Sequence, residues 1–252
     1  MPVPELRIIP IYVSGEILPS DSLFEKLLSA LKHQKLQLAK GDILVVKHKI
    51  VSKAEGQIVE LNAIKPSRSS VTWAKRHKLD ACVIELALCQ SKRVLRRKHG
   101  VIITETRHGF VCANSGVDVS NVDGGEHALL LPEDPDSSAL QLHKEIKKRL
   151  KLHIPVIISD SFGRPWREGL TEVAIGVAGM KPLYDYRGKR DAYGYALHAS
   201  IEAVADELAC AAGLVCGKLE GSPACVIRGF RYQSGRGNAR ELIRPAAKDL
   251  FR

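Results

Sequence analysis

Short oxygen-bearing side chains gather around a glycine in residues 112–123, which read Cys-Ala-Asn-Ser-Gly-Val-Asp-Val-Ser-Asn-Val-Asp. A loop of this composition can present carboxylate, hydroxyl and amide oxygens, the ligands that hard divalent cations prefer. Asp118 and Asn121 can equally form Asx turns, in which the side chain bonds its own backbone. On spacing alone, the metal site and the turn are equally well supported.

A second carboxylate, Asp160, ends an apolar run and is followed by Ser161. Residues 154–160 predict a buried strand, and a carboxylate beside a hydroxyl at a strand end is well placed for Mg²⁺ or Mn²⁺. An aspartate that caps the next turn explains the same residues and is the commoner arrangement. The residues by themselves leave both interpretations open.

The familiar nucleotide and hydrolase motifs are incomplete or absent. Gly213-x-x-x-Gly217-Lys218 is one residue short of a P-loop, and Gly235-x-Gly237 lacks the third glycine of a dinucleotide fingerprint. The sequence contains no H-E-x-x-H and no G-x-S-x-G, and its six cysteines form no C-x-x-C pair. Any chemistry must therefore rest on carboxylates, hydroxyls and basic side chains, with the cysteines as buried thiols.

The elements that would position these residues follow from apolar periodicity and capping signals. Strands are expected at residues 6–13, 43–46, 101–104 and 154–160. Helices are expected after Ser22, over about 72–98, from the capping pair Asp136-Ser137 to about 151, and over 196–212 with Gly213 as a left-handed cap. No repeat or linker divides the chain, so we expect one α+β unit over residues 1–252, with mixed sheets, packed helices and two interwoven subdomains.

The formal charge of +10 suits either nucleic acid or a small polyanionic substrate. The densest basic runs, residues 92–99 and 144–151, alternate with aliphatic rather than aromatic residues, which favours solvated faces of amphipathic helices. No run approaches 18 apolar residues, and residues 1–5 lack the features of a leader, so we expect a cytoplasmic protein without membrane contact.

Several runs occur together in an order that is specific to one family. They are residues 41–46, 50–56, 114–121, 129–132, 134–139, 158–167, 174–176, 203–207 and 226–229. In this order the sequence resembles the F420-0:γ-glutamyl ligases, also called coenzyme F420-0:L-glutamate ligases, and the resemblance spans most of the chain. It favours the metal interpretation of Asp118 and Asp160 over the structural turns.

The resemblance implies a GTP-dependent ligase that joins L-glutamate to coenzyme F420-0 through a γ-glutamyl amide bond, and the number of glutamates added stays open. The substrate carboxylate would take the γ-phosphoryl group, and the glutamate amine would then displace phosphate from the acyl phosphate. Mg²⁺ or Mn²⁺ is the implied metal, and a monovalent cation such as K⁺ is a further candidate. An intertwined homodimer without a nucleic-acid partner is also implied.

The resemblance also implies roles for particular residues. Asp118, Asp160 and Ser161 look like metal ligands. The nucleotide contacts it implies are Ser14, Gly15, Glu16, Ile17, His48, Lys49, Lys53, Asn121, Cys216, Gly217, Lys218, Leu219, Glu220, Gly221 and Ser222. Lys53 is the candidate for a catalytic cation facing phosphate, although a surface lysine would be the usual interpretation of that residue.

Arg164 and Arg167 flank Pro165-Trp166 and are further catalytic candidates. Either guanidinium can fork onto the phosphate of the coenzyme or onto a glutamate carboxylate. Packing of an arginine over Trp166 is an equally good explanation.

One segment departs from the family pattern, in which a Met-Gly-Glu run supplies a glutamate to a second metal. Lys218 stands at the aligned position here, and a protonated lysine cannot ligate a cation. Either Glu220 reaches the metal from a shifted loop, or the Lys218 ammonium replaces part of its charge. The glycines at 217 and 221 make a backbone shift inexpensive, so we favour Glu220 as the ligand.

Three alternatives remain at the level of the sequence. The first is a ligase of the same family for another γ-glutamyl acceptor, such as a folate-like compound. The second is a basic nucleic-acid-binding protein, supported by the charge but lacking a recognisable binding module. The third is a relative that has lost its metal and its activity.

Overall fold

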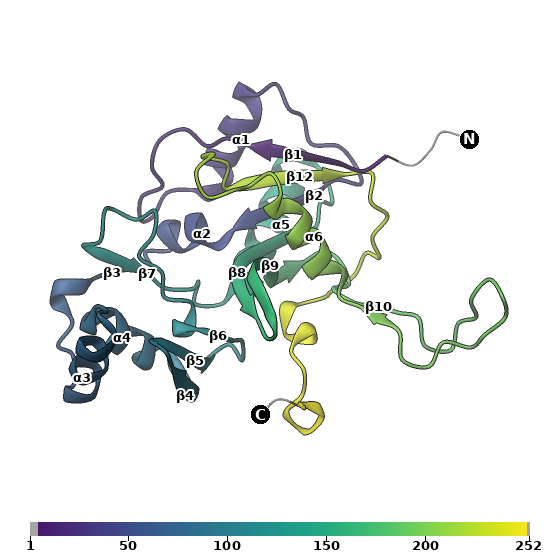
Figure 1. Ribbon diagram of the computed structural model, residues 1–252. Coiled ribbons are helices and arrows are strands. Elements are labelled where there is room, and N and C mark those ends of the chain that lie inside the picture. The colour runs from purple at the N-terminus through teal and green to yellow at the C-terminus, as the bar shows by residue number, and fades with distance from the viewer. Residues whose placement is uncertain (1–4, 251–252) are drawn as a thin grey trace.

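A five-stranded mixed sheet forms the centre of the protein in the computed structural model, which describes residues 5–250 (Figure 1). Its strands, in spatial order, are β1 (Arg7–Ile11), β12 (Ala224–Arg228), β2 (Ile43–Lys47), β8 (Val156–Arg164) and β9 (Arg167–Ala178). Strands β2 and β8 are parallel, and the other neighbours are antiparallel. The expectation about a leader concerned residues 1–5, and residues 1–4 lie outside the described range.

Helices cover both faces of this sheet. On one face lie α1 (Leu23–His33), α2 (His48–Ala54) and α5 (Pro135–Leu150), and on the other lies α6 (Val204–Gly213). Because side chains alternate along a strand, Leu44 and Val46 pack with the first group of helices, whereas Ile43 and Val45 pack with α6. The unbroken apolar run of β2 follows from this burial on both sides.

A smaller region, drawn at the lower left of Figure 1, is built from the chain between α2 and α5. Its elements are β3 (Ile58–Glu60), the 3₁₀ turn η1 (Leu61–Ala63), α3 (Arg68–His77), α4 (Ala81–Cys89), β4 (Ser91–Lys98), β5 (Val101–Thr106), β6 (Val111–Ala113), the 3₁₀ turn η2 (Asn114–Gly116) and β7 (His127–Leu129). It has its own apolar cluster, which includes Leu61, Leu86 and Leu130. The α+β class is thereby confirmed, while the interwoven subdomains and the intertwined dimer stay predictions.

The prediction of one helix over residues 72–98 is wrong, because this stretch contains the end of α3, all of α4 and all of β4. Lys78 adopts a left-handed conformation that ends α3, and Asp80 caps α4 by accepting hydrogen bonds from the backbone N–H groups of Cys82 and Val83. The basic run 92–99 is not a helix face, since Ser91–Lys98 forms strand β4 at the edge of the β4-β5-β6 sheet. Pairing with β5 decides this conformation, because basic residues by themselves favour no strand.

The helix expected over residues 196–212 begins eight residues later, at Val204. Ile201–Glu202 instead forms strand β11, which pairs with β10 (Tyr184–Asp185) at the base of an arm that projects from the body (Figure 1). Gly213 is the last helical residue rather than a left-handed cap, and the cap residue Leu214 has φ −65°. A Cβ at Gly213 would lie 2.7 Å from Cγ of Glu172, so close packing explains this glycine.

The expectation of buried thiols is confirmed for Cys112, Cys216 and Cys225 but wrong for Cys89 and Cys210, which are exposed. Expectations for several strands and helices agree with the structure. The strands expected at 6–13, 43–46, 101–104 and 154–160 correspond to β1, β2, β5 and β8, and Ser22 caps α1 by accepting from the N–H of Glu25. The helix that carries the basic run 144–151 is α5, although it starts at Pro135 with Asp134 as its cap. The 3₁₀ turns η3 (Ala239–Leu242) and η4 (Ala246–Lys248) follow β12. Among the described residues, no helix combines the length and apolar character needed to cross a bilayer.

Candidate functional site

A cleft of about 660 Å³ opens at one end of the central sheet. Residues from five segments contribute to its lining: 13–17, 47–53, 118–121, 159–170 and 217–223. The first follows β1, the second runs from the last residue of β2 through most of α2, and the fourth lies on the β8–β9 hairpin. The sheet thus joins segments separated by up to about 200 positions in the sequence.

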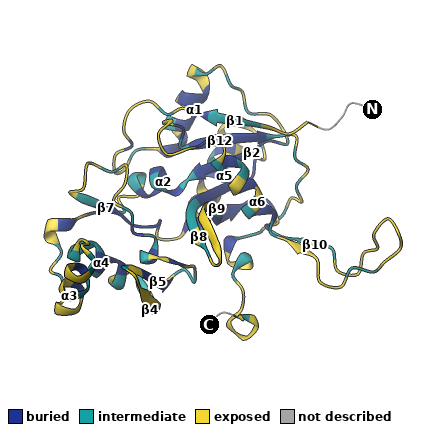
Figure 2. Ribbon diagram, in the orientation of Figure 1, coloured by how far each residue is buried: buried dark blue, intermediate teal, exposed yellow. Residues whose placement is uncertain are grey.

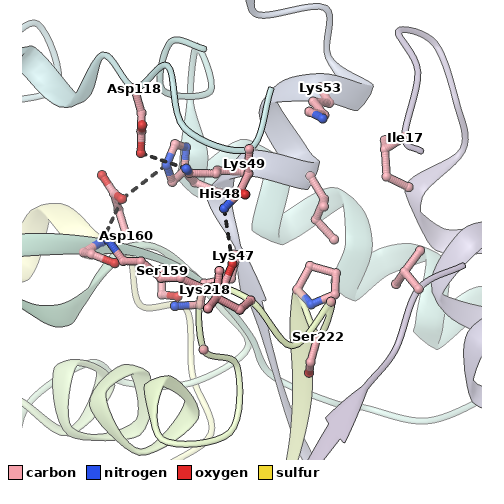
Figure 3. Close-up of a pocket in the computed structure, with 18 of the residues that line it drawn as sticks. Ile17, Lys47, His48, Lys49, Lys53, Asp118, Ser159, Asp160, Lys218 and Ser222 are labelled. Carbon is pink, nitrogen blue, oxygen red and sulfur yellow. Dashed lines mark hydrogen bonds and ion pairs between the residues drawn. The ribbon is translucent and has the colours of Figure 1, made fainter. Parts of the chain in front are cut away.

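Most of the residues singled out in the sequence lie in this cleft. Those that line it are Gly15, Glu16, Ile17, His48, Lys49, Lys53, Asp118, Asn121, Asp160, Ser161, Gly217, Lys218, Leu219, Gly221 and Ser222. In Figure 3, Asp118 and Asp160 lie at one end of the pocket with His48 and Lys49 beside them, and Ile17 and Lys53 lie towards the other end. The two ends therefore differ in chemistry, with carboxylates at one and a lysine beside apolar surface at the other.

The position of Asp118 is fixed by backbone hydrogen bonds as well as by its side chain. Its N–H and C=O both pair with Leu129, at 3.1 and 2.8 Å. The carboxylate then accepts from Lys49 Nζ at 2.8 Å and from the N–H of Ser120 at 2.7 Å. Partial burial raises the pKa of Asp118, but these donors outweigh it and leave the pKa below its ordinary value. The carboxylate is therefore held in its charged form.

Asp160 projects from β8, which is aligned with β2 by parallel pairing. Its Oδ1 accepts from the N–H of Ser161 at 2.7 Å. Nε2 of the buried His48 lies 3.2 Å from the same oxygen, within ion-pair distance but without the alignment of a hydrogen bond. Nδ1 of His48 lies 3.3 Å from Ser52 Oγ, so the ring is anchored within α2 while it faces the carboxylate.

The other end of the cleft is bounded by loops rather than strands. Lys53 Nζ pairs with Glu16 Oε1 at 2.6 Å, which ties α2 to the loop after β1. Asn121 Nδ2 donates to the backbone oxygen of Lys218 at 3.3 Å and joins the loop after η2 to the loop before β12. Each contact thus joins two of the segments that the family resemblance implies for a nucleotide, and that role stays a prediction.

Five of the residues singled out do not line the cleft. These are Ser14, Cys216, Glu220, Arg164 and Arg167. Cys216 is buried beneath the loop, and the Glu220 carboxylate turns back to accept from the N–H of Leu219 at 2.9 Å. The two arginines lie at the turn of the β8–β9 hairpin, whose exposed tip is visible in Figure 2. Arg164 donates to the backbone oxygen of Glu168 at 2.9 Å, and its proposed contact with a substrate anion stays a prediction.

Sequence reasoning missed three residues at the floor of the cleft. Lys47 and Ser159 line it, and Glu172 on β9 lies directly beneath, where it contacts both. The signal for Lys47 was its place as the first charged residue after a buried strand. No sequence feature distinguishes Glu172, because only strand pairing brings it beside β2 and β8.

The oxygen atoms at the carboxylate end fit a hard divalent cation. Asp118 supplies a carboxylate beside the Lys49 ammonium, Asp160 supplies one beside the His48 imidazole, and Ser161 also lines the cleft. Oxygen ligands of this kind suit Mg²⁺ or Mn²⁺ rather than a softer metal. Within the cleft, Asp118, Asp160 and Ser161 are candidates to hold such an ion. A separate and largely exposed cluster lies outside the cleft and consists of Asp123, Glu126 and His127.

Comparison with known proteins gives a consistent result. The family model of F420-0:Gamma-glutamyl ligase matches residues 13–229. The protein named Coenzyme F420:L-glutamate ligase in Methanothermobacter thermautotrophicus is 46% identical over 235 residues, which cover 92% of this chain and 93% of that protein. Proteins of the same name are 42% identical in Methanopyrus kandleri, over 99% of both chains, and 44% identical in Methanocaldococcus jannaschii, over 84% of this chain and 85% of that protein.

Proposed function

The chain belongs to the F420-0:γ-glutamyl ligase family, and from this premise we propose that it joins L-glutamate to coenzyme F420-0 through a γ-glutamyl amide bond at the expense of GTP. The observation that carries the proposal is the convergence of five separate segments on one cleft, with Asp118 and Asp160 at one end and Lys53, which pairs with Glu16, towards the other. The names of the relatives support the reaction, and the cleft supplies a place for it.

In the proposed reaction, a carboxylate oxygen of coenzyme F420-0 attacks the γ-phosphorus of GTP and the bond to the GDP oxygen breaks. The amine of glutamate then attacks the carbonyl carbon of the acyl phosphate, the C–N bond forms, and inorganic phosphate leaves with the amine proton lost to solvent or a base. Both steps bring negatively charged oxygens together, so the protein must hold them in line and neutralise their charge.

Residues at the two ends of the cleft are assigned different parts in neutralising and positioning these oxygens. We assign a divalent cation to Asp118, Asp160 and Ser161, where it would supply charge neutralisation for phosphate oxygens. Lys49 and His48 keep the two carboxylates aimed into the cleft. Lys53 is the cation assigned to nucleotide phosphate, and the remaining nucleotide is assigned to the loop residues that line the cleft at 15–17, 217–219, 221 and 222. The apolar side chain of Ile17, which is buried and lines the cleft, limits the access of water on that side.

We also propose a homodimer, as the family resemblance implies. The arm that extends from β10 and β11 carries Tyr193 and Tyr195 at 97% and 66% exposure, a surface suited to burial against a second copy. Light scattering coupled to gel filtration measures the mass directly, and a mass near 28 kDa at micromolar concentration would contradict the proposal.

The decisive experiment for the activity is phosphate release from GTP with Mg²⁺ or Mn²⁺ present. Release should require coenzyme F420-0 and L-glutamate together, and mass spectrometry should show the glutamylated coenzyme. A folate-like acceptor in place of coenzyme F420-0 serves as the comparison. Release with that acceptor and none with coenzyme F420-0 would contradict the proposed substrate.

A further inference from the structure

A row of polar groups crosses three strands at the floor of the cleft. Glu172 Oε1 pairs with Lys47 Nζ and accepts from Ser161 Oγ at 2.7 Å, while Glu172 Oε2 accepts from Ser159 Oγ at 3.0 Å. Strand register places these groups side by side, since Lys47 is opposite Ser159 and Ser161 is opposite Glu172. The row is therefore built by the sheet and not by a flexible loop.

The fold makes room for Glu172 specifically. Its side chain is 9% exposed and passes against α6 at Gly213, where a Cβ would lie 2.7 Å from Glu172 Cγ. A carboxylate buried to this degree is costly unless donors surround it, and here one ammonium and two hydroxyls do so.

The two ends of the row face different surroundings. Lys47, Ser159 and Ser161 line the cleft, whereas Glu172 lies beneath them. The Lys47 side chain retains 20% exposure, so its ammonium is held from below and is accessible from the cleft. An ammonium has three donors and Glu172 takes one, which leaves donors for an anionic oxygen in the cleft.

We propose that Lys47 binds an anionic substrate oxygen, of phosphate or of carboxylate, beside Asp160 and Ser161, and that Glu172 is the positioning residue that holds Lys47 and Ser161 in place. This inference rests on the proposed function, because the reaction brings a terminal phosphate and two carboxylate-bearing substrates to this end of the cleft. Lys53 lies towards the other end of the pocket (Figure 3), where it pairs with Glu16, so we assign it to a different oxygen.

The test compares Lys47→Met, Glu172→Gln and the double variant with wild type. Lys92→Met and Glu105→Gln are matched controls, because Lys92 pairs at 3.4 Å with a carboxylate that is also 9% exposed but lies outside the cleft. Binding of GTP and of GDP is measured by calorimetry with Mg²⁺ present, thermal unfolding reports folding, and KM is measured for glutamate and for coenzyme F420-0.

If the oxygen belongs to the terminal phosphate, Lys47→Met weakens GTP binding by about tenfold or more and leaves GDP binding within about twofold. If it belongs to a carboxylate, GTP binding is unchanged and KM for glutamate or for coenzyme F420-0 rises by a similar factor. Glu172→Gln should give a smaller change in the same parameter, partly restored by Glu172→Asp. Each of these patterns supports the inference.

The double variant Lys47→Met/Glu172→Gln removes the buried pair without leaving an unpaired charge, so it should fold even where a single variant does not. Wild-type affinities and KM values in a folded double variant would show that the pair is only structural and would overturn the inference. The nucleotide-binding arm needs no turnover. If the wild-type protein fails to glutamylate coenzyme F420-0, the proposed substrate is contradicted. If Lys47→Met nevertheless binds GTP more weakly than wild type does and binds GDP equally well, the role of Lys47 is still supported.

Discussion

The cleft and the α3–α4–β4 region both contain many basic residues, but these charges are neutralised differently. Of the four lysines that line the cleft, Lys47, Lys49 and Lys53 each pair with a carboxylate. Residues 65–98 instead carry ten lysines and arginines against two acids, a net charge of +8. In the described part of the chain, the ion pairs of that segment are those of Lys92 and Arg93 with Glu105.

Three of the four cleft lysines are therefore held in place by ion pairs, whereas most basic residues of segment 65–98 are surrounded by solvent. Paired lysines in the cleft have a fixed geometry and are partly desolvated, so each can act strongly on a bound anion. Most of the net charge of +10 lies outside the cleft, on exposed surface of α3 and β4 (Figure 2). The overall charge is therefore a poor guide to where a substrate binds.

The largest expected effect comes from the carboxylates of the cleft. Asp118→Asn and Asp160→Asn should each lower kcat by about 100-fold or more, because an amide cannot match the charge that a carboxylate gives a divalent ion. Steady-state phosphate release measures the loss, and circular dichroism should show an unchanged fold. Turnover near wild type in either variant would remove that residue from the site.

Lys53→Ala should have the next largest effect. Loss of a charge-assisted contact to phosphate should weaken GTP binding by about tenfold and reduce the dependence of binding on salt. Lys78→Ala, on the basic segment, is the matched control and should leave GTP affinity unchanged. Equal behaviour of the two variants would mean that Lys53 is another surface lysine.

A change of a few fold is expected in the loop before β12. For Glu220 to ligate a metal, its carboxylate must leave the N–H of Leu219, which the glycines at 217 and 221 allow. Glu220→Gln should then raise the Mg²⁺ concentration for half-maximal activity by about threefold, whereas Lys218→Ala should not. The opposite pattern would assign Lys218, which already lines the cleft, to the screening of phosphate.

The smallest effect on activity is expected from the basic segment itself. The combined change Arg96→Gln, Arg97→Gln and Lys98→Gln should leave kcat and GTP affinity within about twofold of wild type, since these residues do not line the cleft and exposed charges are screened by salt. Retention on a heparin column should fall. Activity lost in parallel with retention would show that the segment contributes to the reaction and would remove the distinction between the two regions.

Sequence reasoning succeeded where local chemistry decides structure. The strands β2 and β8, the Ser22 cap of α1 and the basic helix α5 were all predicted, because apolar runs and caps act over a few residues. It failed for β4 and for the start of α6, where pairing with β5 and between β10 and β11 overrides helical periodicity. It also did not find Glu172, whose partners come from two other strands.

The sequence by itself determined the family of the protein, its α+β class and most of the residues that line the cleft, because ordered motifs survive in the chain whatever their distance in space. Only the tertiary structure decided which charges are paired, that Glu220 turns away from the cleft, and that Lys47 and Glu172 form its floor. The physical reason is that an ion pair depends on distance and burial, and both are set by which strands lie side by side.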